Sequence, residues 1–174
     1  MRAWLGAALL VLSGCASVAP AERTPGVESF SGRLAVHVDA DGASAARSFS
    51  AAFELEGDAT SGRLDLTTPL GSIVARARWT PESVVLATPR GETPYPDLDA
   101  LTHDLIGESL PVAALFDWLQ GRPWPSAPAE PAPAGAGFDQ LGWSVDLAHF
   151  RDDALLAAHR ARRPAVDVRI KLDR

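Results

Sequence analysis

The sequence predicts a mainly β domain with helices, in the α+β class. Three observations carry this prediction. Apolar and polar residues alternate with a period of two from residue 30 to residue 88, the period becomes helical between residues 98 and 119, and alternation returns from residue 143 to residue 172. Such alternation indicates antiparallel strands with one apolar face and one polar face.

The first half of the chain has the signals of an antiparallel meander. Its first strand begins near Phe30, where Leu34, Val36 and Val38 alternate with polar or small neighbours. Further strands are expected over residues 48–55, 64–66, 73–79 and 83–88. Turn residues such as Gly57-Asp58 separate these runs, so consecutive strands are expected to pair as hairpins.

Two short helices are predicted in the middle of the chain. The first lies between Asp97 and Gly107, which suit the start and the end of a helix. Its apolar positions are Leu98, Leu101, Leu105 and Ile106. The second runs from Pro111, at a first-turn position, to Gly121 as its stop, with Trp118 beside the apolar stripe. That stripe consists of Val112, Leu115, Phe116 and Leu119.

The last third combines a loop with further strands. Residues 122–136 contain five prolines and are predicted to be a loop, either a gate or, preferably, a spacer. Strands return around residues 143–147 and 166–172. Residues 154–160 fit a helix or a strand. A strand is favoured, because Arg162-Arg163-Pro164 then forms a hairpin turn to the final strand.

A secretory signal is predicted at the start, where Arg2 precedes the apolar stretch 3–12, which is too short to span a bilayer. Cys15, the only cysteine, follows Leu12-Ser13-Gly14. This pattern resembles the bacterial lipobox, whose cysteine is joined to diacylglycerol before the signal is removed. The alternative is an ordinary signal peptide that happens to contain a cysteine. We expect Cys15 to become an acylated N-terminus that serves as the lipid anchor.

Three segments are therefore predicted. Residues 1–14 form a removed lipoprotein signal peptide, residues 15–29 an acylated tether, and residues 30–174 a single domain. Loss of Arg2 with the signal changes the formal net charge from −6 to −7. This acidity argues against nucleic acid as a partner and against adsorption on anionic lipid. A monomer is expected.

The sequence lacks the patterns of common catalytic and metal sites. Lys171 is the only lysine, which excludes the Gly-Lys-Ser/Thr end of a P-loop. The four histidines show no metal-ligand spacing, and there is no Gly-x-Ser-x-Gly motif. We expect no catalytic residue, no metal and no cofactor. An acyl-processing enzyme stays open as an alternative, because catalytic triads assemble in space rather than in sequence.

Several short motifs follow one another along the chain. They are Ser31-Gly32-Arg33-Leu34-Ala35-Val36, Pro69-Leu70-Gly71-Ser72, Leu110-Pro111-Val112, Trp118-Leu119-Gln120-Gly121-Arg122-Pro123 and Gln140-Leu141-Gly142-Trp143. Each is weak alone. As an ordered set downstream of Cys15, they resemble the outer-membrane lipoprotein insertase family LolB across almost the whole chain beyond the signal.

The resemblance implies an incomplete antiparallel β-barrel with a short helical lid enclosing an apolar cavity. The cavity would accept the acyl chains of client lipoproteins from the periplasmic carrier LolA, and the protein would insert the clients into the outer membrane. Cavity-lining residues are expected to be Phe53, Leu66, Ile73, Trp79, Leu86, Leu115, Trp118 and Trp143. Without a nucleotide, the handover must run downhill in affinity, from LolA to this protein to the membrane.

Leu70 is the most specific single candidate. It stands between Pro69 and Gly71, which favour a projecting turn, and LolB-family proteins carry an exposed leucine at this place that engages the membrane. The alternative is a leucine folded back onto the core. Insertion of one leucine contributes roughly 1.5 to 3 kcal/mol, enough for transient contact with outer-membrane lipid but not for anchoring.

Other features leave alternatives open. LolB-type proteins usually have a helix before the first strand, whereas here a proline-containing stretch stands there, so the cavity volume is open. Ala16-Ser17 contains no Asp of the kind that retains lipoproteins at the inner membrane, which favours the periplasmic face of the outer membrane. Arg33, Arg76 and Arg78 are expected on polar faces, as solvated surface or as contacts for an acidic carrier. A structural or adaptor lipoprotein is the alternative function.

Overall fold

The computed structural model describes residues 28–42, 44–133 and 135–174. Its strands are β1 (Glu28–Val38), β2 (Arg47–Gly57), β3 (Gly62–Thr67), β4 (Ile73–Thr80), β5 (Ser83–Thr88), β6 (Gly91–Tyr95), β7 (Ala129–Pro131), β8 (Gly137–Gln140), β9 (Trp143–Asp146), β10 (Leu155–Arg160) and β11 (Val166–Leu172). Its helices are α1 (Leu98–Ile106), α2 (Val112–Trp118) and α3 (Phe150–Asp153). The predicted signal peptide, Cys15 and nearly all of the tether lie outside the described residues.

All eleven described strands join one antiparallel sheet, in the order β6-β5-β4-β3-β2-β1-β11-β10-β9-β8-β7. Most consecutive strands pair as neighbours, and β1 also pairs with β11, where Leu34 lies opposite Ile170. Within the described part of the chain, β6 and β7 are the two edges, so the sheet is not closed. This arrangement confirms the predicted incomplete antiparallel barrel with helices.

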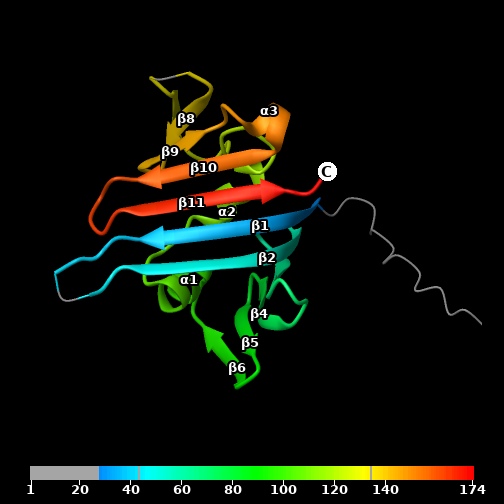
Figure 1. Cartoon of the computed structure of the whole chain (residues 1–174). Helices are drawn as coiled ribbons and strands as arrows, with labels where there is room; N and C mark the ends of the chain where they lie inside the picture. Colours follow the sequence, from blue (N-terminus) through cyan, green and yellow to red (C-terminus); the bar gives the residue numbers. More distant parts are fainter. Residues whose placement is uncertain (1–27, 43, 134) are drawn as a thin grey trace, which may run out of the picture.

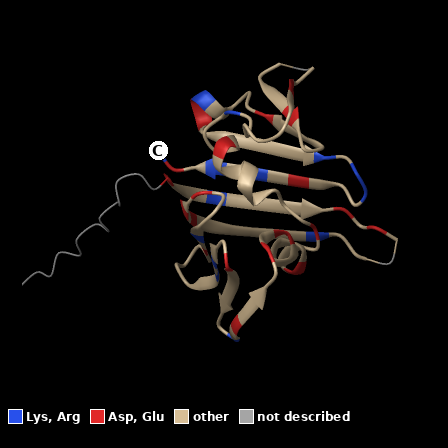
Figure 2. Cartoon of the chain, turned by 180° about the vertical axis from the view of Figure 1, so that it is seen from behind, with Lys and Arg blue, Asp and Glu red and all other residues tan. Residues whose placement is uncertain are grey.

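The two faces of the sheet differ as the alternation predicts. The buried hydrophobic residues of the four central strands are Val36, Val38, Ala51, Phe53, Leu55, Leu156, Ala158, Val166, Val168 and Ile170. In Figure 1, α1 and α2 lie behind these strands, and Figure 2 shows the same helices from the other side. Both helices therefore cover the apolar face, and the opposite face is left to solvent.

The first predicted helix is confirmed as α1, with both of its predicted ends. The Asp97 side chain accepts a hydrogen bond from the backbone N–H of Ala100 at 2.7 Å, and Gly107 ends the helix with φ at 90°. From β6, the Tyr95 hydroxyl donates to the Asp104 carboxylate on α1. That hydrogen bond raises the pKa of Tyr95 above its ordinary value. The contact holds α1 against the edge of the sheet.

The second predicted helix is confirmed as α2, but its buried side is wider than the predicted stripe. The buried residues are Val112, Ala114, Phe116 and Trp118, whereas Leu115 is half-buried. Val112, Phe116 and Leu119 of the predicted stripe are buried, and the buried side extends beyond the stripe to Ala114 and Trp118. The reason is that α2 lies inside the curled sheet, where aromatic rings reach it from several strands. The turn that follows the helix ends at Gly121, with φ at 76°.

The second half confirms one open choice and contains elements that the sequence did not predict. Residues 155–160 form a strand, β10, as favoured. The segment predicted as a loop contains the three-residue strand β7, and β6, β8 and α3 were not predicted. Pro94 and Pro131 argue against strands in a sequence, because proline has no backbone N–H to donate to a neighbouring strand. They are tolerated in β6 and β7 because these are the two edge strands of the sheet. β8 joins β9 through Leu141-Gly142, whose φ values of 55° and 77° suit a two-residue hairpin turn.

Candidate functional site

Two groups of aromatic rings fill the concave face of the sheet, and both include a residue of α2. Phe116 packs edge-on against Trp79 of β4 and Phe30 of β1, with ring centroids 6.2 and 6.4 Å apart. The second group consists of Trp118, Phe138 and Trp143, with centroids 6.2 and 6.3 Å from that of Trp118. The side chains of α2 thus occupy the interior in which a cavity was expected.

Most of the residues predicted to line a cavity lie in this interior. The buried ones are Phe53, Leu66, Trp79, Leu86, Trp118 and Trp143. Leu115 is half-buried and packs against the same core. The sequence therefore identifies much of the apolar interior, while contact of these side chains with acyl chains stays a prediction.

Ile73 does not belong to the interior, and its predicted position is wrong. It is 48% exposed, and its neighbour Val74 is 37% exposed. The register between β3 and β4 shifts here, because Leu66 lies opposite Ala75 while Thr67 lies opposite Ile73. One extra residue in β4 forms a β-bulge, which reverses the alternation on one side of it. The bulge turns both apolar side chains to solvent beside the β3–β4 loop.

Gln140 connects α2 to the proline-rich segment and is 2% exposed. Its Oε1 accepts hydrogen bonds from Trp118 Nε1 at 2.8 Å and from the backbone N–H of Trp124 at 2.9 Å. Its Nε2 donates to the carbonyl oxygens of Trp124 at 2.7 Å and Ala127 at 2.9 Å. The amide thus uses its full bonding capacity. Residues 124–127 are fixed to the interior, a role that the Gln140-Leu141-Gly142-Trp143 motif alone did not indicate.

A nearly buried ion pair holds the linker between α1 and α2. Arg160 of β10 donates to Glu108 of the linker, with 2.5 Å between Nη2 and Oε2. The Arg160 guanidinium also lies over the Trp143 ring, 5.4 Å from its centroid. Arg160 is 9% exposed, so this pair gives directional contact rather than large net stability. It fixes where the two helices meet the sheet.

The β3–β4 loop presents Leu70 to solvent. The backbone N–H of Gly71 donates to the Thr68 carbonyl at 2.9 Å, which closes a turn with Pro69 at its second position. Leu70 is 94% exposed, so it does not fold back onto the core. The segment from Thr68 to Val74 carries no charged residue. The sequence prediction of a projecting turn therefore agrees with the geometry, and its membrane contact stays a prediction.

The conformation of Gly71 gives a direct test of this loop. Its φ is 82°, and apart from its chain neighbours no atom lies within 4 Å of the place that a Cβ would take, so backbone strain and not crowding limits substitution. We expect Gly71→Val to disturb the turn at a cost of about 1 to 2 kcal/mol. Gly71→Asn should keep the turn, because asparagine tolerates this region. Thermal unfolding of both variants measures the difference, and equal stability of the two would contradict the assigned turn.

Other kinds of site receive no support from the described residues. No group of three or more His, Cys, Asp or Glu side chains in this part of the chain is placed to hold a metal ion. His37, His103, His149 and His159 are all exposed. None of the described helices combines the length and the apolar character needed to cross a membrane.

Comparison with known proteins identifies the family. The model of the family described as "Outer membrane lipoprotein LolB" matches residues 29–174. The chain is 35% identical over 161 residues to the outer-membrane lipoprotein LolB of Bordetella petrii, with 87% of this chain and 80% of that protein covered. It is 33% identical over 180 residues to the outer-membrane lipoprotein LolB of Cupriavidus pinatubonensis, with 98% of this chain and 84% of that protein covered. The chain therefore belongs to the LolB family of outer-membrane lipoproteins.

Proposed function

We propose that this protein accepts acylated lipoproteins from the periplasmic carrier LolA and inserts them into the outer membrane. It acts without catalysis, by holding the acyl chains of its client in the apolar interior. Family membership supports the role. The observation in this chain that carries the proposal is the combination of an open sheet around an aromatic interior with a leucine that is 94% exposed.

The filled interior gives a physical reason for a downhill handover. Acyl chains must compete with Phe116 and Trp118 for the concave face, so part of their binding free energy is spent on moving α2. This cost lowers the affinity of the protein for acyl chains and so favours their release into the bilayer. Each factor of ten in affinity corresponds to about 1.4 kcal/mol. A modest displacement cost is therefore enough to favour release into the membrane without a nucleotide.

Transfer of a client tests this proposal. A soluble form lacking residues 1–15 retains the described sheet and interior, because both lie within residues 28–174. We expect an acylated client bound to purified LolA to move to this form, as judged by separating the two proteins. If the client stays on LolA and the soluble form binds no acyl chain, a structural or adaptor lipoprotein replaces the proposed function.

Cys15 supplies the attachment in this proposal, at the periplasmic face of the outer membrane, and the protein acts as a monomer. We expect Cys15→Ser, exported with an ordinary cleavable secretory signal in place of residues 1–14, to leave the protein in the soluble periplasmic fraction, because no acyl chain then holds it. The purified variant should still accept a client from LolA, since the interior is unchanged. Fractionation of cells and the transfer assay give the two readouts. Membrane-bound Cys15→Ser protein would show that another segment provides the attachment.

A further inference from the structure

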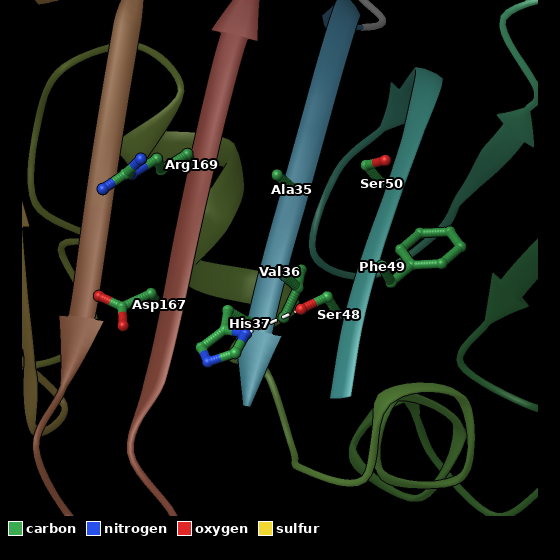
Figure 3. Close-up of a pocket in the computed structure, with 8 residues that line it drawn as sticks. All are labelled: Ala35, Val36, His37, Ser48, Phe49, Ser50, Asp167 and Arg169. Carbon is green, nitrogen blue, oxygen red and sulfur yellow. Dashed lines mark hydrogen bonds between the residues drawn. The ribbon is translucent and has the colours of Figure 1, made fainter. Parts of the chain in front are cut away.

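The solvent face of the central strands contains a shallow trough. Strand register places Ala52, Arg33 and Lys171 in one row across β2, β1 and β11. The next row contains Ser50, Ala35 and Arg169. Small side chains thus form the floor on β1 and β2, and long cationic side chains rise beside it. Figure 3 shows Ala35 and Ser50 on neighbouring strands, with Arg169 on β11 at the side.

The trough is bordered by the loop that carries Leu70. Two adjoining hollows, of about 360 and 460 Å³, share the lining residues Ala35, Ser50 and Arg169. The smaller hollow is also lined by Arg33, Lys171 and Pro69. Pro69 immediately precedes Leu70 in the turn. The cations of β1 and β11 and the exposed leucine are therefore parts of one continuous surface.

The three cations of this trough are not neutralised within the described structure. Arg76, Arg78 and Arg122 pair with carboxylates on the same protein. By contrast, Arg33, Arg169 and Lys171 form no ion pair with any described residue, and Lys171 donates only to the Asp153 carbonyl oxygen. Glu54 and Asp173 lie in the next row, beside Ser31, and Asp167, which pairs with His159, lines the larger hollow. The smaller hollow is lined by all three cations and by no carboxylate of the described residues, so it presents unpaired positive charge on an acidic protein.

We propose that this trough binds the phosphate of an anionic phospholipid headgroup when Leu70 enters the bilayer. The proposal rests on the membrane contact in the proposed function. Arginine binds phosphate with paired hydrogen bonds, and the small floor of Ala35 and Ser50 leaves room for a headgroup. A net charge of −6 over the whole chain opposes approach to anionic lipid. Local cations next to Leu70 offset that repulsion and orient the protein with its loop towards the membrane.

Vesicle flotation with the soluble form lacking residues 1–15 tests the trough, because the acylated form would float whatever the headgroup. The probes are phosphatidylcholine vesicles and vesicles of phosphatidylcholine and phosphatidylglycerol in equal parts. The test variant is Arg33→Gln/Arg169→Gln, whose side chains make no polar contact within the described residues. The matched control is Arg90→Gln/Arg162→Gln, which removes the same charge from exposed turns away from the trough.

We expect the original protein to bind the phosphatidylglycerol vesicles more tightly than pure phosphatidylcholine vesicles. In the test variant, the affinity for the phosphatidylglycerol vesicles should fall about fivefold for each charge removed. Added salt should have the same effect, since the attraction is screened. Binding to pure phosphatidylcholine and the stability of both variants should not change. Equal losses of affinity in the test and control variants would contradict headgroup binding by the trough, because only net charge would then matter.

The client transfer assay separates this inference from the proposed function. Acceptance from LolA takes place without vesicles, so the test variant should accept clients normally. If it accepts clients but keeps full affinity for phosphatidylglycerol, the trough alone is wrong. If the original protein accepts no client yet shows charge-dependent flotation, the proposed function is wrong and the trough stands. If only the test variant fails to accept clients, the trough instead binds an acidic surface of another protein.

Discussion

Leu70→Glu is expected to abolish delivery of clients to the membrane while leaving their acceptance intact. The side chain is 94% exposed and contributes nothing to the core, so folding should be unchanged. Its insertion into the bilayer is worth roughly 1.5 to 3 kcal/mol, which corresponds to about a 10- to 150-fold loss of membrane contact. A carboxylate adds repulsion from anionic headgroups. Release of a preloaded client into outer-membrane vesicles is the measurement.

Leu141→Glu is the matched control for this variant. Leu141 is also an exposed leucine in a hairpin turn, at 47%, but it lies between β8 and β9, far along the sheet from the β3–β4 loop. The two substitutions change charge and hydrophobicity equally. We expect Leu141→Glu to deliver clients at the original rate. Normal delivery by Leu70→Glu, or equal loss in both variants, would contradict the specific role of Leu70.

Ile73 and Val74 add to the exposed apolar surface of the β3–β4 loop. The bulge in β4 exposes both, so the apolar surface beside Leu70 is larger than the single residue that the sequence motif indicates. They are less exposed than Leu70, so in the proposed membrane contact they would add apolar area to a shallow insertion rather than a deep anchor. This geometry agrees with the proposed transient contact of the loop with the membrane, in which the proposed acylation of Cys15 would provide the attachment.

Local signals made the strands and the first helix predictable. Alternation fixes which residues of β1, β2, β10 and β11 face the core, because each strand has one buried face. Asp97 and Gly107 mark the ends of α1 through capping chemistry that involves only neighbouring residues. Leu70 could be identified for the same reason, since Pro69 and Gly71 specify a turn by their own backbone preferences.

The features that could not be predicted depend on contacts between segments that are distant in the sequence. The bulge that exposes Ile73 depends on the register between β3 and β4, which the sequence of one strand does not contain. The burial of Trp118 depends on β8 and β9 closing around α2. The cationic trough could not be predicted either, because Arg33 and Arg169 become neighbours only through the pairing of β1 with β11.

Gln140→Leu is expected to cause a large loss of stability for a single substitution in the polar interior. It removes all four hydrogen bonds of the amide and leaves the Trp118 N–H, which is buried, without its partner. An unsatisfied buried polar group costs about 1 to 3 kcal/mol. The backbone groups of Trp124 and Ala127 are half-buried and regain part of their bonding from water. The expected total is about 2 to 4 kcal/mol, or a Tm lower by roughly 5 to 15 °C.

Gln120→Leu is the control, because Gln120 is a half-buried glutamine whose amide bonds Glu28 and the Phe116 carbonyl near solvent. Its expected cost is below about 1 kcal/mol. Amide exchange should separate the two further, since only Gln140→Leu frees residues 124–127 from α2. If both variants unfold at the same temperature, the amide of Gln140 does not hold the proline-rich segment. If Gln140→Leu is destabilised as expected and also takes up acyl chains more readily, the segment limits how far α2 can move.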